Sequence, residues 1–181
     1  MNDVFSYTIN IPDFSNLLLW LMFLCFLGCC VTLWPMLIMS KFFLRKDGTR
    51  FSILLFQLPL SVSKFKTLVD TITDRTKDTV RMNLKIDYFF MPFAYFLLLF
   101  GGWLTLHRQQ FSFAESDYYK FLFVPLAAWA FDIMENRMAS SCIKSVTTTK
   151  ARILFVLSLL KWILIIGYLI FLIFISLNIA N

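Results

Sequence analysis

The sequence has little of what enzymes and metal-binding proteins use. It contains one histidine, His107, and four cysteines in 181 residues. It has no glycine-rich phosphate loop, no serine-centred nucleophile elbow and no HExxH metal motif. A cysteine–histidine pair would require Cys25, Cys29 or Cys30, inside one apolar run, to reach His107 at the end of another. We therefore predict that the chain is not an enzyme, with no catalytic residues, and that it uses no cofactor or metal.

The four cysteines are not placed for a structural disulfide, because three of them lie in the same apolar run. Cys25 and Cys29 share a helical face, and cysteines at this spacing can hold a metal. Small packing residues in a lipid-buried helix explain them more simply. Cys142 lies in a basic segment, where it is either a site for palmitoylation or a free thiol, and we favour the free thiol.

Positive charge is missing from the start of the chain. Residues 1–16 contain no Lys or Arg, so they lack the basic region that begins a secretory signal. The apolar run that follows, at residues 17–39, is longer than the core of such a signal, and no small-residue cleavage site follows it. We expect this run to remain in the protein as its first helix.

Long apolar runs are what the sequence has in abundance. Hydrophobic residues make up 59% of the chain and 22 residues are Phe, which is more apolar surface than a soluble domain of this size can bury. A run of about 20 residues crosses about 30 Å of hydrocarbon as a helix. We predict an all-α, polytopic membrane protein with a single domain, residues 1–181. Its four transmembrane helices lie at about 17–39, 86–106, 118–137 and 153–177, the third being the most polar.

The charged residues between the apolar runs predict how the chain crosses the membrane. The first connection contains ten Lys and Arg residues and the third contains four, whereas the second contains only Arg108 and Lys120. Cytoplasmic loops carry an excess of Lys and Arg. The first and third connections are therefore expected in the cytoplasm, and the N- and C-termini outside.

A formal net charge of +6 also raises the question of a nucleic-acid partner. No recognition motif accompanies the charge. The basic residues instead face the cytoplasmic leaflet, where anionic lipid headgroups attract them. We predict membrane lipids, and no nucleic acid, among the partners.

The first connection is long enough to form a cytoplasmic helical insertion at residues 45–85. An apolar stretch at 51–60 comes first. Ser61 can cap the helix after it, whose apolar residues fall on one face: Val62, Phe65, Val69 and Ile72. A second helical stretch of mixed charge then runs into the second span. We predict that the amphipathic helix rests on the membrane, or else binds another protein through the same face. The residues expected to bind lipid or this partner are Lys64, Lys66, Arg75, Lys77 and Arg81.

Five polar residues lie where the prediction places hydrocarbon: Asp87, Asp132, Glu135, Asn136 and Lys161. Lys161 lies nine residues beyond Arg152, or about 13 Å along a helix. A lone charge at that depth costs about 2.5 to 3.5 kcal/mol, which favours pairing inside the bundle. Asp132, Glu135 and Asn136 have i, i+3, i+4 spacing and share one helical face. We therefore predict an interior polar cluster in which Lys161 faces Asp132 or Glu135.

This cluster has two interpretations. Carboxylates near an ammonium can relay protons or bind a cation, and charged groups inside membranes often mark ion routes. Alternatively the polar residues bond the helices to one another and fix their register. We favour this structural role because no second basic group accompanies the cluster. Tyr88, Tyr95 and Tyr168 can supply hydrogen-bond partners.

The order of these polar motifs resembles a known group. The segments are Phe56-Gln57-Leu58, then Asn83-Leu-Lys-Ile-Asp87-Tyr-Phe-Phe-Met with Tyr95, then Asp132-Ile-Met-Glu135-Asn136, then Lys161-Trp162. Together they resemble an uncharacterised group of small bacterial four-helix integral membrane proteins with an Asp-x-x-Glu-Asn motif. The resemblance covers the chain from about residue 50 onward and implies a bacterial inner membrane, but no activity. The size and layout also look like the membrane subunits of bacterial defence systems such as Kiwa.

Two functions are compatible with these features. The first is a non-enzymatic membrane subunit, a scaffold or a sensor of membrane state, that presents a basic cytoplasmic face to anionic lipid, to a cytoplasmic partner protein or within a homo-oligomer. The second is an oligomeric channel or transporter subunit that uses Asp132, Glu135 and Lys161. The sequence has no internal repeat and no pair of broken helices, both common in transporters, so we favour the first.

Overall fold

The computed structural model describes residues 12–59, 61–108 and 117–177. Within these residues the structure is helical, and the β-type pairings are two isolated bridges, Leu44 with Arg50 and Arg45 with Ile72. The all-helical prediction is thus confirmed. The helices in chain order are α1 (Pro12–Ser40), α2 (Leu54–Gln57), α3 (Val62–Thr71), α4 (Asp74–Arg108), the 3-10 helix η1 (Asp117–Phe123), α5 (Val124–Lys144) and α6 (Thr148–Leu177).

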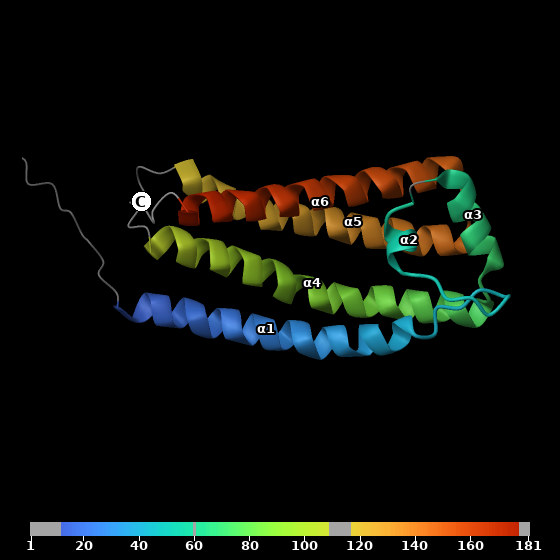
Figure 1. Cartoon of the computed structure of the whole chain (residues 1–181), viewed down its shortest axis with the longest axis horizontal. Coiled ribbons are helices and arrows are strands. Elements are labelled where there is room, and N and C mark those ends of the chain that lie inside the picture. Colours follow the sequence, from blue (N-terminus) through green and yellow to red (C-terminus); the bar gives the residue numbers. More distant parts are fainter. Residues whose placement is uncertain (1–11, 60, 109–116, 178–181) are drawn as a thin grey trace, which may run out of the picture.

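Four long helices lie side by side and alternate in direction (Figure 1). α1 packs along α4, α5 packs along α6, and α4 also contacts α5, so the two pairs form one bundle. The connections at residues 41–73 and 145–147 lie at the same end, which we call the loop end. α1 begins and α6 ends at the opposite end. The basic first connection and the basic residues that flank residues 145–147 therefore lie at the same end of the bundle.

Three of the described helices are long and apolar enough to span a membrane: Phe14–Ser40 within α1, all of α4, and all of α6. They include the predicted spans at 17–39, 86–106 and 153–177. The predicted span at 118–137 falls on η1 and α5, which do not pass the same test. The reason is that α5 carries three charged residues near its middle, namely Asp132, Glu135 and Arg137.

The helix α4 is longer than a membrane requires. Its 35 residues extend about 52 Å, against about 30 Å of hydrocarbon. It begins at Asp74, so the stretch of mixed charge and the second predicted span form one continuous helix, as the sequence predicted. The first turns of α4 therefore extend to the loop end, where they contact the first connection.

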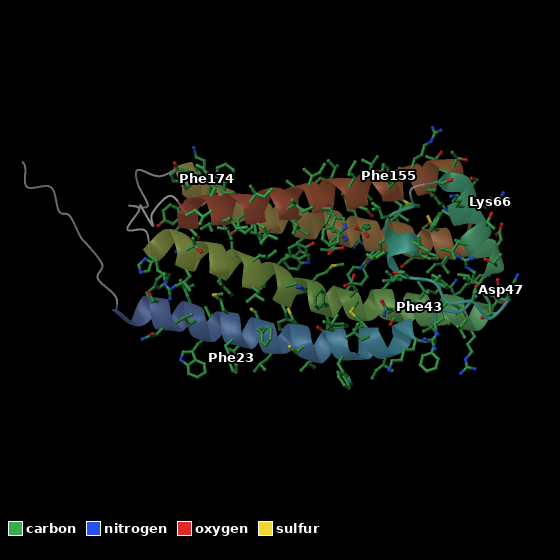
Figure 2. All side chains as sticks on the ribbon, viewed as in Figure 1. Phe23, Phe43, Asp47, Lys66, Phe155 and Phe174 are labelled. Carbon is green, nitrogen blue, oxygen red and sulfur yellow. The ribbon has the colours of Figure 1, made fainter. Side chains whose placement is uncertain are left out.

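The outer surface of the long helices is apolar. On α1, Trp20 is 65% exposed and Trp34 is 69% exposed, and Phe23 lies on the side that faces away from the other helices (Figure 2). On α6, Ile170 and Phe174 are exposed in the same way. Such a wide apolar surface is unfavourable in water and is typical of helices that lie in lipid.

The first connection folds back onto the bundle instead of extending away from it. Phe43, Phe51, Phe56 and Phe65 are buried in one core with apolar residues of α4, α5 and α6. The rings of Phe56 and Phe65 meet edge to face, with centroids 5.1 Å apart. The described part of the apolar stretch, residues 51–59, therefore packs against α5 and α6.

The apolar face of α3 points into this loop-end core. Phe65, Leu68 and Val69 are buried there, whereas Lys64 is exposed. The prediction that this face rests on the membrane or binds another protein is therefore wrong, because the chain itself covers the face. Ser61 is at the N-cap position, but its hydroxyl makes no capping bond there.

A tight turn holds the outermost part of the loop end. Gly48 has a φ of 80°, a left-handed conformation that favours glycine. Asp47 accepts hydrogen bonds from the hydroxyl and the backbone N–H of Thr49, at 2.7 and 2.9 Å. These bonds hold the pKa of Asp47 below its usual value. Asp47 therefore stays ionised among the basic residues of this end.

Two glycines allow close packing between the helices. A Cβ at Gly28 of α1 would overlap the ring of Phe93 on α4, and a Cβ at Gly102 of α4 would overlap the hydroxyl oxygen of Tyr168 on α6. The Tyr168 hydroxyl donates to the backbone carbonyl of Leu98, at 3.2 Å. The absence of a side chain at Gly102 thus lets Tyr168 reach the backbone of α4.

Candidate functional site

The predicted polar cluster is assembled from three helices that lie side by side. α5 is in the centre and contributes Asp132, Glu135 and Asn136, whose spacing puts them on one side of the helix. α4 contributes Asp87 and Tyr95, which are about two turns apart, and α6 contributes Lys161. The five predicted residues are nearly inaccessible: Asp87 is 7% exposed, Asp132 8%, Lys161 4%, and Glu135 and Asn136 0%.

Lys161 binds both acidic residues that the sequence offered as alternatives. Its Nζ donates to Oδ1 of Asp132 at 2.9 Å and lies 2.5 Å from Oε2 of Glu135. The other carboxylate oxygen of Asp132, Oδ2, accepts a hydrogen bond from the Tyr95 hydroxyl at 2.9 Å. The predicted pairing of Lys161 is therefore confirmed, and Asp132 links all three helices.

Asp87 has a different partner. Its Oδ2 accepts a hydrogen bond from the side-chain amide of Asn136 at 2.6 Å. Asn136 and Glu135 are adjacent in sequence, so their side chains leave α5 about 100° apart, one toward α4 and the other toward α6. The cluster therefore has two parts, the Lys161 ion pairs and the Asp87–Asn136 pair.

Three further buried polar side chains connect the bundle to distant backbone, through bonds that sequence analysis did not predict. Ser158 donates to the carbonyl of Gln57, Asn83 donates to the carbonyl of Met36 at 3.1 Å, and Thr76 donates to the carbonyl of Leu44 at 2.9 Å. Spacing was the available signal, because Ser158 is three residues before Lys161 and Asn83 is four residues before Asp87. Thr76 and Ser158 thus fix the first connection to α4 and α6, and Asn83 fixes α4 to α1.

One acceptor atom in the cluster lacks a hydrogen bond to any described residue. It is Oδ1 of Asn136, on a side chain that is fully buried. Buried polar atoms are normally paired, since an unpaired one loses its hydration without compensation. The cluster therefore has more acceptors than donors when all its carboxyl groups are ionised.

The three tyrosines that were expected to supply hydrogen bonds, Tyr88, Tyr95 and Tyr168, lie at different places in the bundle. Tyr95 belongs to the cluster, whereas Tyr168 bonds to the backbone of α4 nearer the opposite end. Tyr88 is half-buried beside Arg137 of α5. Only one of the three therefore supplies a hydrogen bond to the predicted carboxylates in the described part of the chain.

The five basic residues predicted to bind lipid or a partner are not equivalent. Lys64, Lys66 and Arg75 are exposed at the loop end, where Figure 2 shows Lys66. Lys77 pairs with Asp74 at 2.9 Å and Arg81 pairs with Asp78 at 2.8 Å, both within α4. The positive charge of these two pairs is therefore partly offset within the helix.

The positions of His107 and the cysteines do not support catalysis by a cysteine–histidine pair. The ring of His107 packs against Phe14, with centroids 5.4 Å apart. Cys25 is eleven residues beyond Phe14 along α1, or about 16 Å by helical rise, so Cys25 and His107 cannot form a nucleophile–base pair.

Cys142 is buried in the loop-end core, which leaves no room for an acyl chain. Within the described residues, no three His, Cys, Asp or Glu side chains form a group that could hold a metal ion.

The fold and the site define an all-helical protein with three helices that can span a membrane and a polar cluster buried among the last three long helices. No protein-family model matches the chain, and comparisons with curated proteins and with solved structures also give no match.

Proposed function

We propose that this chain is a four-span integral membrane protein that acts without enzymatic chemistry and whose loop end binds anionic lipid headgroups as a scaffold or sensor of membrane state. In this proposal η1 and α5 form the third of the four spans, because the two acidic side chains of α5 are turned inward and paired. The loop end is the cytoplasmic end under the positive-inside rule, and both termini lie outside. The membrane is a bacterial inner membrane, in line with the resemblance described above.

One observation carries the proposal: the charge is segregated along the bundle. Residues 40–85 and 137–152, which include the connections at the loop end and the adjoining helix ends, together contain 14 of the 17 Lys and Arg residues but only four of the 11 acidic residues. Ten of these basic side chains are exposed: Lys41, Lys46, Arg50, Lys64, Lys66, Arg75, Lys85, Arg137, Lys144 and Arg152. Each Lys or Arg near an anionic leaflet contributes about 1 kcal/mol of attraction.

The packing of α3 favours lipid over a protein partner. A protein interface usually has an apolar centre with a polar rim. The apolar face that would form such a centre is buried in the loop-end core, and α3 presents Ser63, Lys64, Lys66 and Thr67 outward. This exposed face is suited to bind lipid headgroups, because headgroups are bound through charge and hydrogen bonds and not through an apolar pocket.

The test is a charge reversal at the three exposed predicted residues, Lys64→Glu, Lys66→Glu and Arg75→Glu. The purified protein in mild detergent is titrated with phosphatidylglycerol or phosphatidylcholine, and the retained lipids are counted by native mass spectrometry. We expect phosphatidylglycerol binding to weaken by about 3 kcal/mol, or roughly a hundredfold, with phosphatidylcholine unaffected. Lys77 and Arg81 are left unchanged because reversing them would break intrahelical ion pairs.

Asp70 provides a matched control on the same helix, because it is exposed and carries the opposite charge. Asp70→Lys should strengthen phosphatidylglycerol binding. Equal retention of phosphatidylglycerol by the native protein and the triple variant would refute the lipid-binding proposal.

A second candidate function is an oligomeric channel or transporter subunit. The observation that favours it is the burial of Asp132, Glu135 and Lys161 deep inside the bundle, since ionisable groups at that depth often line ion routes. Four helices are few for a pathway through one copy, so this function requires an oligomer. It predicts ion flux into proteoliposomes from the purified protein alone, and loss of that flux in the variant Asp132→Asn with Glu135→Gln.

A further inference from the structure

The buried cluster contains more acidic than basic groups. Three carboxyl groups, on Asp87, Asp132 and Glu135, lie with one ammonium group, on Lys161. Lys161 contacts Asp132 and Glu135 directly. With every group ionised, the cluster would carry a net charge of −2 in an environment where ions are poorly solvated.

Asp87 is the carboxyl group that the ion pairs do not reach. Its direct contact is the neutral amide of Asn136. The groups that act on it from the neighbouring helices are Asp132 of α5, which repels a negative charge on Asp87, and Lys161 of α6, which attracts it but is bonded to two other carboxylates. On α4 itself the titratable groups that interact with Asp87 are Tyr88 and Tyr95. The part of α1 from Phe14 to Ser40 contains no charged residue.

Asn136 supplies an independent observation. Its amide nitrogen donates to Asp87, while its carbonyl oxygen, Oδ1, is fully buried and has no donor among the described residues. A carboxylate cannot supply a donor, because it accepts hydrogen bonds only. A carboxylic acid has one O–H group and can supply it. A proton on Asp87 would therefore remove a buried charge and would also bring a donor to the side chain that lacks one.

We propose that Asp87 binds a proton and that Asp87 and Asn136 form a neutral acid–amide pair inside the bundle. The Asp87 carboxylate takes one proton from a hydronium ion of the bulk solvent, so that one O–H bond forms on Asp87, one O–H bond of the hydronium ion breaks, and a water molecule is left. Asp132 and Glu135 keep their ion pairs with Lys161, so the proton is confined to the α4 side of the cluster. This inference does not depend on lipid binding at the loop end and can fail or succeed separately.

Infrared spectroscopy of the native protein tests the proposal without requiring that any variant folds. Protonated carboxyl groups absorb at a higher frequency than carboxylates, and isotopic labelling of the side-chain carboxyl carbon shifts the band. In detergent near neutral pH, we expect a protonated-carboxyl band that shifts when Asp is labelled but not when Glu is labelled. Asp87→Asn should abolish that band, while Asp78→Asn, an exposed acid on the same helix, should leave it unchanged.

Asn136→Leu is the complementary variant. It removes the amide but leaves Asp87 in place, so the protonated band should persist and move to higher frequency as its hydrogen bond is lost. The proposal is overturned if the native protein shows no protonated Asp band, if the band responds to Glu labelling, or if it survives in Asp87→Asn.

Discussion

α1 and α6 are almost equally apolar helices of similar length, yet they have different positions in the bundle. Of the most apolar part of each, 11% is buried in α1 and 28% in α6. α1 packs along α4 at the edge of the bundle and has no charged residue from Phe14 to Ser40, whereas α6 packs along α5 and carries the buried Lys161 and Ser158. Apolarity therefore identifies a helix that can span a membrane, but its few polar residues determine which side of it faces protein.

The largest expected effect comes from removing the charge that distinguishes α6. Lys161→Met leaves Asp132 and Glu135 without their cation in a buried site. We expect a loss of about 3 to 5 kcal/mol in the free energy of unfolding, since breaking a buried ion pair from one side strands the opposite charge. Thermal unfolding in detergent measures it. Leu24→Met, an exposed apolar change on α1, is the control and should change stability by less than about 0.5 kcal/mol.

A compensating change tests whether these groups act as one unit. Adding Asp132→Asn or Glu135→Gln to Lys161→Met should recover part of the lost stability, because it removes one of the stranded charges. Strict additivity of the single effects would show that the Lys161 contacts do not contribute to folding.

A smaller loss of stability is expected from replacing the glycines at the helix–helix contacts with alanine. Gly102→Ala pushes against Tyr168, which is 2% exposed and has no free space to move into, so we expect a loss of about 2 kcal/mol. Gly28→Ala on α1 pushes against Phe93, which is 37% exposed and can turn outward, so its loss should be smaller. Gly167→Ala meets no atom within 4 Å and should be neutral or stabilising. Equal losses at Gly102 and Gly28 would contradict this assignment.

The smallest expected effect on stability comes from removing the hydroxyl group of Ser158 or of Thr32. Ser158 of α6 donates to the distant Gln57 carbonyl, so Ser158→Ala should cost about 1 kcal/mol by leaving that buried acceptor unpaired. Thr32 of α1 donates to the carbonyl of Gly28 in its own helix, at 2.7 Å, and Thr32→Ala should cost less than about 0.5 kcal/mol. Both are measured by thermal unfolding, and a larger loss from Thr32→Ala would reverse the comparison drawn between the two helices.

The sequence was sufficient where one energy term dominates. An ammonium deep in hydrocarbon is costly enough that Lys161 had to pair, and the spacing of Asp132 and Glu135 identified the partners. Serine and asparagine carry a smaller cost inside a membrane and gave no comparable signal, so the bonds from Ser158 to Gln57 and from Asn83 to Met36 were not predicted. The split of the cluster between α4 and α6 also depends on how α5 is rotated, which spacing alone does not determine.

The fate of the apolar face of α3 could not be decided from its sequence for a different reason. Lipid, another protein and the chain's own core all offer an apolar surface, so Phe65 and Val69 gain similar burial energy from each. The side that covers them depends on contacts with α6, more than 70 residues further along the chain. Local periodicity contains no information on that distant partner.

The fold-back of the first connection has a consequence for the order in which the protein can be completed. Phe43, Phe51 and Phe56 leave the ribosome long before the helices α5 and α6 that cover them, and the bond between Ser158 and Gln57 spans 101 positions of sequence. Until α5 and α6 have been synthesised, the apolar residues of this segment are not covered by their final neighbours. Transiently exposed apolar surface of this kind makes folding intermediates prone to aggregate. The segment between α1 and α4 is therefore the part of the bundle that matures last, because its core is complete only after α6 has been synthesised.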